Sequence, residues 1–203
     1  MKKVFLLFLV SFLMIFTKSS FAKEIVGPGG TSSGYKPDDV AFNVSIVTLT
    51  DGLNSSFDTD GHSFILIENI TSLSFNVIGI TIHNRETISL GTYGNTNPTG
   101  LWINRELQVI GGKIAHNSVY LTKQVKIKDE DKLDKFLLEQ IDWNYTRNCS
   151  TYAVNFWNKM FNDSLSAKQG LIDTPTGLYN SIMSKNYFQK DIYLPLTTYS
   201  RPH

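Results

Sequence analysis

The amino-acid sequence predicts an α+β fold in which a mostly antiparallel sheet is followed by packed helices. Six segments between residues 41 and 127 are rich in β-branched and aromatic residues, and several alternate apolar with polar positions, which is typical of strands. From residue 129 onward the apolar residues recur at the spacing of a helix instead. Because the strands come first and the helices follow, the α+β class is favoured over an alternating α/β fold.

The first 22 residues are expected to form a cleavable secretory signal. Two lysines precede an apolar run over residues 4–16, and Ser20 and Ala22 are small residues where a signal peptidase reads the chain. The alternative is an uncleaved anchor, but the run is shorter than the roughly 20 apolar residues that a spanning helix requires. We therefore expect the mature chain to begin at Lys23, to be secreted or periplasmic, and to contain no integral membrane span.

Residues 23–40 are predicted to be a flexible leader, because they include a stretch rich in Gly, Pro and Ser, and residues 41–203 to be a single domain. The 19 basic and 18 acidic residues nearly balance and form no long run of either sign, so no nucleic-acid partner is expected. Charged residues make up only 18% of the chain and aromatic residues 12%, which favours a globular chain over a disordered one.

Turn-forming pairs such as Asp60-Gly61 and Gly111-Gly112 separate the expected strands. The strands expected between such turns cover residues 41–50, 62–68, 73–82, 86–93, 101–109 and 118–127.

Three helices are expected after the strands. The first covers residues 129–141, which have an acidic first turn and apolar residues at helical spacing. Asn148 is a good N-cap for the second, whose apolar residues through about Phe161 suit it to the core. Thr174 is a further N-cap, followed by Pro175 at the first helical position, so a third, short helix should begin there.

Cys149 is the single cysteine of the sequence, so it has no disulfide partner within its own chain. It is buried and inert, paired with another chain, or reactive. Its position directly after Asn148 places it in the first turn of the second helix, where backbone N–H groups and the helix dipole favour a thiolate. The same N–H groups can stabilise the oxyanion of a tetrahedral intermediate. The alternative interpretation is that the junction of helix and sheet simply requires a small residue.

A cysteine nucleophile requires a general base, and the sequence contains four histidines. His62 is the leading candidate because it begins a predicted strand, and a strand fixes an imidazole better than a loop does. His203 is the terminal residue, His116 is expected in a loop and His83 in a turn. A histidine at the start of a strand can also be purely structural. The internal histidines and Cys149 show none of the short spacings of zinc ligands, so neither a metal nor a cofactor is expected.

Four short segments carry a resemblance to a known family. They are Gly61-His62-Ser63-Phe64-Ile65, Leu90-Gly91-Thr92-Tyr93-Gly94, Gly100-Leu101-Trp102-Ile103-Asn104 and Asn148-Cys149-Ser150-Thr151-Tyr152-Ala153, the last with Trp157 further along the helix. The chain resembles the circularly permuted branch of papain-like proteins related to NlpC/P60, which includes the lecithin retinol acyltransferase-like proteins. In that branch the histidine strand precedes the cysteine helix, as His62 precedes Cys149 here. The resemblance covers roughly residues 51–161.

The resemblance implies a thiol mechanism in which His62 deprotonates Cys149 and the thiolate attacks a carbonyl to form an acyl-enzyme. In this branch a polar side chain, usually on a strand after the histidine strand, orients the imidazole. The candidates by position are Thr92, Asn104 and Glu106. Asn148 is a further candidate for binding the oxyanion, with helix capping as its alternative role.

The resulting hypothesis is an exported cysteine peptidase or amidase that cleaves an amide bond in a peptide or peptidoglycan-like substrate, since NlpC/P60 relatives commonly act on cell-wall muropeptides. Two alternatives remain on the same fold: a secreted effector or binding module, and an acyltransferase or thioesterase that acts on lipid. Aromatic residues near the motifs either line a substrate groove or belong to the core. They are Tyr93, Trp102, Trp143 and Tyr145.

Overall fold

The computed structural model describes residues 34–50, 61–139 and 142–203. The expected secretory signal, the first part of the expected leader and residues 51–60 and 140–141 lie outside these ranges. The chain divides into the units Met1–Gly34 and Tyr35–His203, and all the elements below belong to the second.

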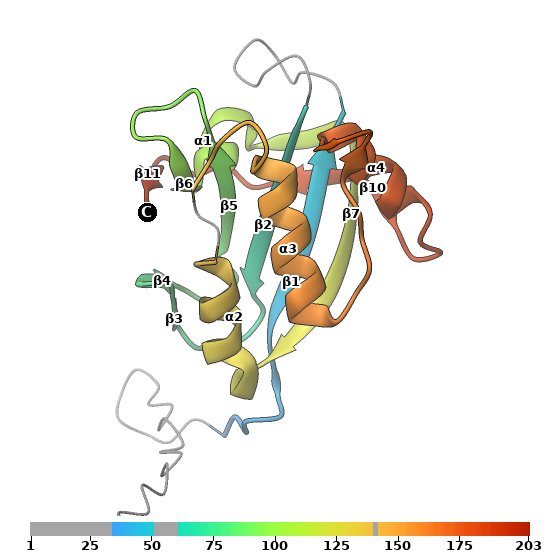
Figure 1. The fold of residues 1–203 in the computed structure, drawn as a ribbon. Coiled ribbons are helices and arrows are strands. Elements are labelled where there is room, and N and C mark those ends of the chain that lie inside the picture. The colour runs from blue at the N-terminus through green and yellow to red at the C-terminus, as the bar shows by residue number, and fades with distance from the viewer. Residues whose placement is uncertain (1–33, 51–60, 140–141) are drawn as a thin grey trace, which may run out of the picture. The chain divides into compact units, whose positions relative to one another are not determined.

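A seven-stranded sheet with the order β10-β7-β1-β2-β5-β6-β11 forms the centre of this unit (Figure 1). Every neighbouring pair is antiparallel, which confirms the prediction of a mostly antiparallel sheet. Its strands are β1 (Val40–Leu49), β2 (His62–Asn69), β5 (Thr87–Tyr93), β6 (Gly100–Ile103), β7 (Lys113–Lys126), β10 (Gln189–Leu194) and β11 (Arg201–Pro202). Two small hairpins stand apart from it, namely β3 (Phe75–Val77) with β4 (Ile80–Ile82), and β8 (Lys168–Gln169) with β9 (Ile172–Asp173).

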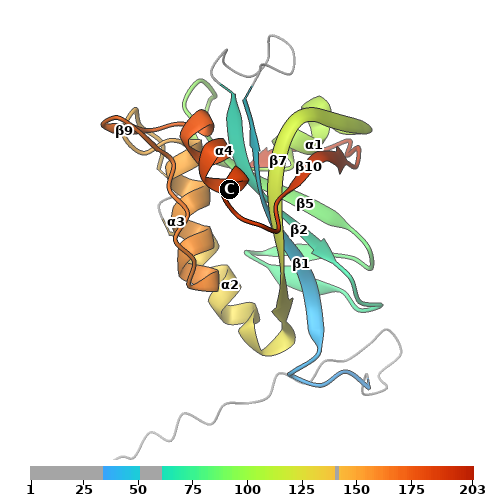
Figure 2. The same cartoon turned by 90° about the vertical axis from the view of Figure 1, so that its right-hand side faces the viewer.

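Three helices cover one face of the sheet (Figure 2). They are α2 (Glu130–Leu137), which follows the 3₁₀ turn η1 (Ile127–Asp129), α3 (Cys149–Phe161) and α4 (Pro175–Met183). Helix α3 packs against β1, β2 and β5, and its Tyr152, Phe156 and Trp157 side chains are buried. The mixed α+β class predicted from the order of strands and helices is therefore confirmed.

The opposite face of the sheet carries a second apolar cluster. Val47 and Phe64 alternate along their strands with Thr48 and Ser63, which face the helices, so they point to the other side. There they pack with residues of the short helix α1 (Arg105–Ile110) and of β10. Both faces of the sheet are thus buried around β1 and β2, which holds the start of β2 rigidly.

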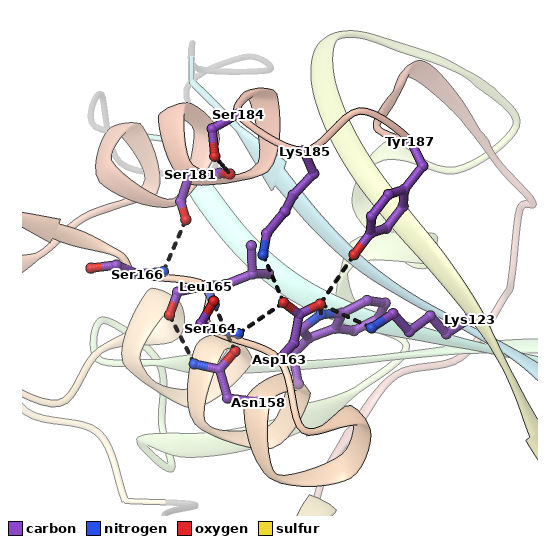
Figure 3. Close-up of polar contacts among 11 residues, drawn as sticks. Lys123, Asn158, Asp163, Ser164, Leu165, Ser166, Ser181, Ser184, Lys185 and Tyr187 are labelled. Carbon is purple, nitrogen blue, oxygen red and sulfur yellow. Dashed lines mark hydrogen bonds and ion pairs between the residues drawn. The ribbon is translucent and has the colours of Figure 1, made fainter.

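Asp163 lies just after the end of α3, and its side chain is only 8% exposed. Figure 3 shows its polar contacts. Its carboxylate accepts hydrogen bonds from Lys123 of β7 (2.9 Å) and from Lys185 just after α4 (2.7 Å). The indole N–H of Trp157 (3.1 Å) and the hydroxyl of Tyr187 (3.2 Å) also donate to it. This one carboxylate therefore ties α3 to the sheet and to the segment that follows α4.

Two predicted strands differ from the structure in ways that affect the site. The segment 73–82 is a hairpin rather than one strand, because its turn places Ile78 and Gly79 at positive φ. The segment 101–109 is a strand only to Ile103, after which Asn104 adopts a left-handed conformation (φ 61°) and the chain turns into α1. The prediction of a strand through residue 109 was therefore wrong.

Smaller differences concern the ends of elements. The last strand before the helices, β7, begins at Lys113 rather than at 118, so His116 lies in a strand and not in the expected loop. Helix α2 ends at Leu137, whereas the predicted helix continued to residue 141. Strand β10 was not predicted, since only Ile192 and Leu194 of its six residues are buried.

Candidate active site

Cys149 is the first residue of α3, as the capping pattern predicts. The side-chain oxygen of Asn148 accepts hydrogen bonds from the N–H groups of Ser150 (2.9 Å) and Thr151 (3.3 Å), and the Thr151 hydroxyl accepts one from Asn148 N–H (3.4 Å). This reciprocal arrangement is a capping box. The amide nitrogen of Asn148 donates to the carbonyl of Asp173 (2.7 Å), so both ends of its side chain are engaged. Asn148 thus has the capping role that was the alternative to oxyanion binding.

His62 is the first residue of β2 and is only 5% exposed. Its imidazole stacks on the ring of Tyr93, with ring centroids 4.7 Å apart, and on Phe64 at 5.8 Å. Gly61, directly before it, has φ +86°, and a Cβ there would lie 2.1 Å from the carbonyl oxygen of Leu49. Local backbone and aromatic packing therefore fix the ring in one orientation.

The structure brings Cys149 and His62 together through a hydrogen bond between the thiol and the imidazole. The other side of the ring is engaged as well, since His62 Nε2 lies 2.9 Å from Glu106 Oε1. The remaining ring nitrogen, Nδ1, is the one available to the sulfur. The three side chains form a series from sulfur through imidazole to carboxylate, although they come from α3, β2 and α1.

Glu106 is fully buried and is the residue that contacts the imidazole among the three positional candidates. Its Oε1 also accepts a hydrogen bond from the Tyr93 hydroxyl (2.7 Å), and its Oε2 accepts one from the Ser89 hydroxyl (2.6 Å). The carboxylate thus has three donors, which is what a buried charge requires to remain ionised.

Asn104 and Thr92 have other positions. Asn104 occupies the N-cap position of α1. Its side-chain oxygen accepts a hydrogen bond from the Ser89 N–H (3.0 Å), and its own N–H donates one to the Ser89 carbonyl (2.8 Å). It therefore supports the position of Glu106 through the backbone of Ser89. Thr92 lines the cleft beside Cys149, but no hydrogen bond joins it to His62.

Gly91 leaves the space in which His62 and Glu106 meet. A Cβ on this residue would lie 2.0 Å from Glu106 Oε1 and 2.9 Å from His62 Nε2, so any side chain would collide with that hydrogen bond. Ser89, Gly91 and Tyr93 share one face of β5 because side chains alternate along a strand. Ser89 and Tyr93 therefore donate hydrogen bonds to the Glu106 carboxylate, and Gly91 leaves the space that the carboxylate occupies.

Electrostatics favour the ionised form of the whole series. Burial lowers the pKa of His62, but the charges of Cys149 and Glu106 and the hydrogen bonds to both raise it further, to about 9. Burial raises the pKa of Cys149, but the charge and hydrogen bond of His62, together with donors from Ser63 N–H and the Ser150 hydroxyl, bring it below its usual value. Burial also raises the pKa of Glu106, and its hydrogen bonds to His62, Ser89 and Tyr93 lower it by more. The opposite shifts of the Cys149 and His62 pKa values therefore favour a thiolate beside an imidazolium over a neutral thiol beside a neutral imidazole.

A cleft of about 670 Å³ opens at Cys149 and His62. Four parts of the chain form its walls: the residues that follow β5, the residues that precede α3, strand β9, and the first residues of α4. Trp143 forms one wall and lies against Gly94, where a Cβ would overlap its ring at 2.2 Å. Tyr93 and Tyr145 also line the cleft, as expected for a groove, whereas Trp102 is not among its lining residues. The described residues that line it include no Lys or Arg.

The other histidines are not brought to Cys149. His83 contacts the Ser74 hydroxyl at 3.1 Å, and His116 lies 3.7 Å from Asp191 at the surface. His203 follows the short edge strand β11 at the end of the chain.

No cluster of three or more potential metal ligands occurs among residues 34–50, 61–139 and 142–203. In the same ranges, no helix is long and apolar enough to cross a membrane.

Comparison with known proteins adds no assignment to this geometry. No protein-family model matches the chain, and neither the curated proteins nor the solved structures give a match.

Proposed function

We propose that this chain is an exported cysteine hydrolase that cleaves an amide bond, with Cys149 as nucleophile, His62 as general base and acid, and Glu106 as the group that orients the imidazole. The observation that carries the proposal is the hydrogen-bonded series Cys149, His62, Glu106 at the base of an open cleft. A nucleophile, a base in contact with it and a third group that holds the base are the recurring parts of thiol catalysis.

The geometry supports a two-step reaction. The Cys149 thiolate attacks the carbonyl carbon, and the carbonyl π electrons move to the oxygen. When the carbonyl re-forms, the C–N bond breaks and the imidazolium of His62 gives its proton to the departing nitrogen. The neutral imidazole then takes a proton from water, which attacks the thioester and releases the acid and the thiolate. Glu106 keeps its charge throughout and stabilises the imidazolium.

A circularly permuted papain-like fold is the architecture that we propose for this site. It is supported by a histidine on a strand that precedes, in sequence, a cysteine at the N-terminus of a helix packed on the same sheet. The position of Glu106 on a short helix after β6, rather than on a strand, departs from the usual arrangement that the resemblance implies.

A peptide or peptidoglycan-like chain is the substrate class that we propose. The cleft has aromatic walls and is also lined by Asp173, whose carboxylate pairs with Lys168 at 3.1 Å, and its described lining has no Lys or Arg side chain to attract phosphate or sulfate groups. These features suit a neutral or zwitterionic peptide better than an anionic lipid headgroup.

The test is digestion of purified peptidoglycan, with peptide and acyl-ester substrates in parallel, by the wild type, Cys149→Ala and His62→Ala. Each substitution should abolish hydrolysis, and the double variant should resemble the single ones because the two residues act as a unit. Equal thermal melts would separate chemistry from folding. Hydrolysis that survives in Cys149→Ala contradicts the mechanism, and a wild type that is inert on every substrate favours a binding or effector module.

A further inference from the structure

Thr92 carries a buried polar group that the proposed series of Cys149, His62 and Glu106 does not use. The residue is 2% exposed and lines the cleft, and its hydroxyl is the one buried side-chain oxygen or nitrogen without a hydrogen-bond partner in the described part of the chain. An unpaired buried hydroxyl is costly, so a group of this kind at a functional cleft needs an explanation.

Strand alternation places the Thr92 side chain on the face of β5 that α3 covers. Its neighbours Gly91 and Tyr93 face Glu106 on the opposite side, so Thr92 points toward the helices. The ladder between β2 and β5 runs from Glu68↔Thr87 to Ile65↔Leu90. Ser63 and Thr92 each lie two residues beyond the end of this ladder, on the same face of their strands as Ile65 and Leu90.

Ser63, on this face of the sheet, contacts the nucleophile. Its backbone N–H donates a hydrogen bond to the Cys149 thiol, and its hydroxyl contacts the Ser150 hydroxyl at 3.0 Å and the Thr48 hydroxyl at 2.9 Å. Thr92 lies on the same face of the sheet as these hydroxyls and lines the cleft together with Cys149. Its own hydroxyl has no protein partner in the described ranges.

The N-terminus of α3 supplies the second part of the site. The Asn148 cap takes the N–H groups of Ser150 and Thr151, and the N–H of Cys149 itself, at the first helical position, is not among those it binds. The positive end of a 13-residue helix thus lies at the sulfur.

We propose that the Thr92 hydroxyl and the backbone N–H of Cys149 together bind the carbonyl oxygen of the substrate, so that Thr92 stabilises the oxyanion formed when Cys149 attacks. This assignment rests on the proposed acyl transfer at Cys149. The unpaired hydroxyl in the free protein receives its acceptor only when the substrate carbonyl enters between β5 and α3.

Two reagents separate oxyanion stabilisation from thiolate reactivity. p-Nitrophenyl acetate acylates the thiolate: sulfur attacks the carbonyl, an oxyanion forms, and its collapse expels p-nitrophenolate and leaves an acetyl thioester. Iodoacetamide alkylates the same sulfur by displacing iodide, without any oxyanion. Thr92→Val removes the hydroxyl at constant shape. It should slow acylation on the order of 10²-fold, leave alkylation unchanged, and leave the melting temperature equal or higher because an unsatisfied group is gone.

Matched variants complete the test. Thr92→Ser, which keeps the hydroxyl, should acylate like the wild type, whereas Thr92→Ala should be as slow as Thr92→Val. Thr122→Val removes a hydroxyl that is paired with Ser45 on β1, away from the cleft, and should not change acylation. Acylation of Thr92→Val at the wild-type rate, or an equal loss in acylation and alkylation, overturns the role of Thr92 alone. A wild type that is alkylated but never acylated overturns this role and the proposed function together.

Discussion

Glu106 Oε1 lies 2.9 Å from His62 Nε2 inside the protein, although 44 residues separate the two side chains in the sequence. The contact depends on the reversal of the chain at Asn104, which turns the end of β6 into α1 and directs Glu106 back over β5. It gives the imidazole a buried negative partner and leaves its other nitrogen to Cys149.

Glu106→Gln should lower thiolate reactivity and hydrolysis while keeping the side-chain shape. Without the carboxylate charge the pKa of His62 falls, the imidazolium stabilises the thiolate less, and the pKa of Cys149 rises. We expect a loss of about tenfold or more in activity near pH 7. The measurement is the rate of iodoacetamide alkylation against pH. Glu68→Gln, a half-buried glutamate bonded to Asn43 on the same sheet, is the control and should leave the profile unchanged. A Glu106→Gln profile identical to the wild type would remove Glu106 from the site.

Gly91→Ala should separate His62 from Glu106 by steric overlap, since the new methyl group would lie 2.0 Å from Glu106 Oε1. Forcing a methyl group into a filled core costs about 1–3 kcal/mol of unfolding free energy, so the melting temperature should fall. The alkylation profile should shift to higher pH in the folded variant, as for Glu106→Gln. Gly34→Ala, where a Cβ meets nothing within 4 Å, is the control. Full activity in Gly91→Ala would mean that the His62–Glu106 contact is dispensable.

Asp163→Asn should destabilise the fold by about 2 kcal/mol at pH 7, because hydrogen bonds to a charged, buried group are lost. Burial raises the pKa of Asp163, but Lys185 and Lys123 lower it by more, to well below its usual range. A depressed carboxylate pKa contributes stability above the unfolded value of about 3.9 and loses it as the pH falls further. The difference in unfolding free energy between wild type and variant should therefore stay nearly constant from pH 7 to about pH 4 and narrow as the pH falls below that value.

Chemical denaturation at several pH values measures this gap. Asp38→Asn is the control, because Asp38 is exposed and pairs only with surface lysines, so its loss should leave the stability unchanged. A gap between wild type and Asp163→Asn that stays constant down to pH 3 would contradict the proposed role of the charge.

The proposed export predicts a defined N-terminus. Signal cleavage after Ala22 would make Lys23 the first residue of the protein recovered outside the cytoplasm, which mass spectrometry of the intact chain can show. Replacing Ala22 by Arg should block processing, because the peptidase requires a small residue there. Recovery of the wild type with Met1 still attached would contradict the prediction.

The local parts of the site could be predicted from the sequence. A cap, the start of a helix and the start of a strand depend on neighbouring residues, so Asn148, Cys149 and His62 were placed correctly on their elements. The strand-then-helix order likewise gave the α+β class.

The choice of Glu106 could not be made in this way. Its segment has β-branched and aromatic residues that favour a strand, and α1 has only six residues, too few for a helical period to be recognised. The left-handed conformation of Asn104 that starts α1 is set by its contacts with Ser89, which is distant in sequence. One usable signal was present in β5, where Ser89, Gly91 and Tyr93 alternate two polar side chains with a glycine on a single face.

The pH dependence of Cys149 alkylation tests the central claim most directly, because it reports the thiolate without requiring a known substrate. The pKa of Cys149 is lowered and that of His62 is raised to about 9, and both shifts favour the ion pair. We predict an inflection in the iodoacetamide rate clearly below the ordinary thiol value of about 8.5, and an upward shift of that inflection in His62→Ala. An inflection near the ordinary value in the wild type, unmoved by His62→Ala, would contradict the account.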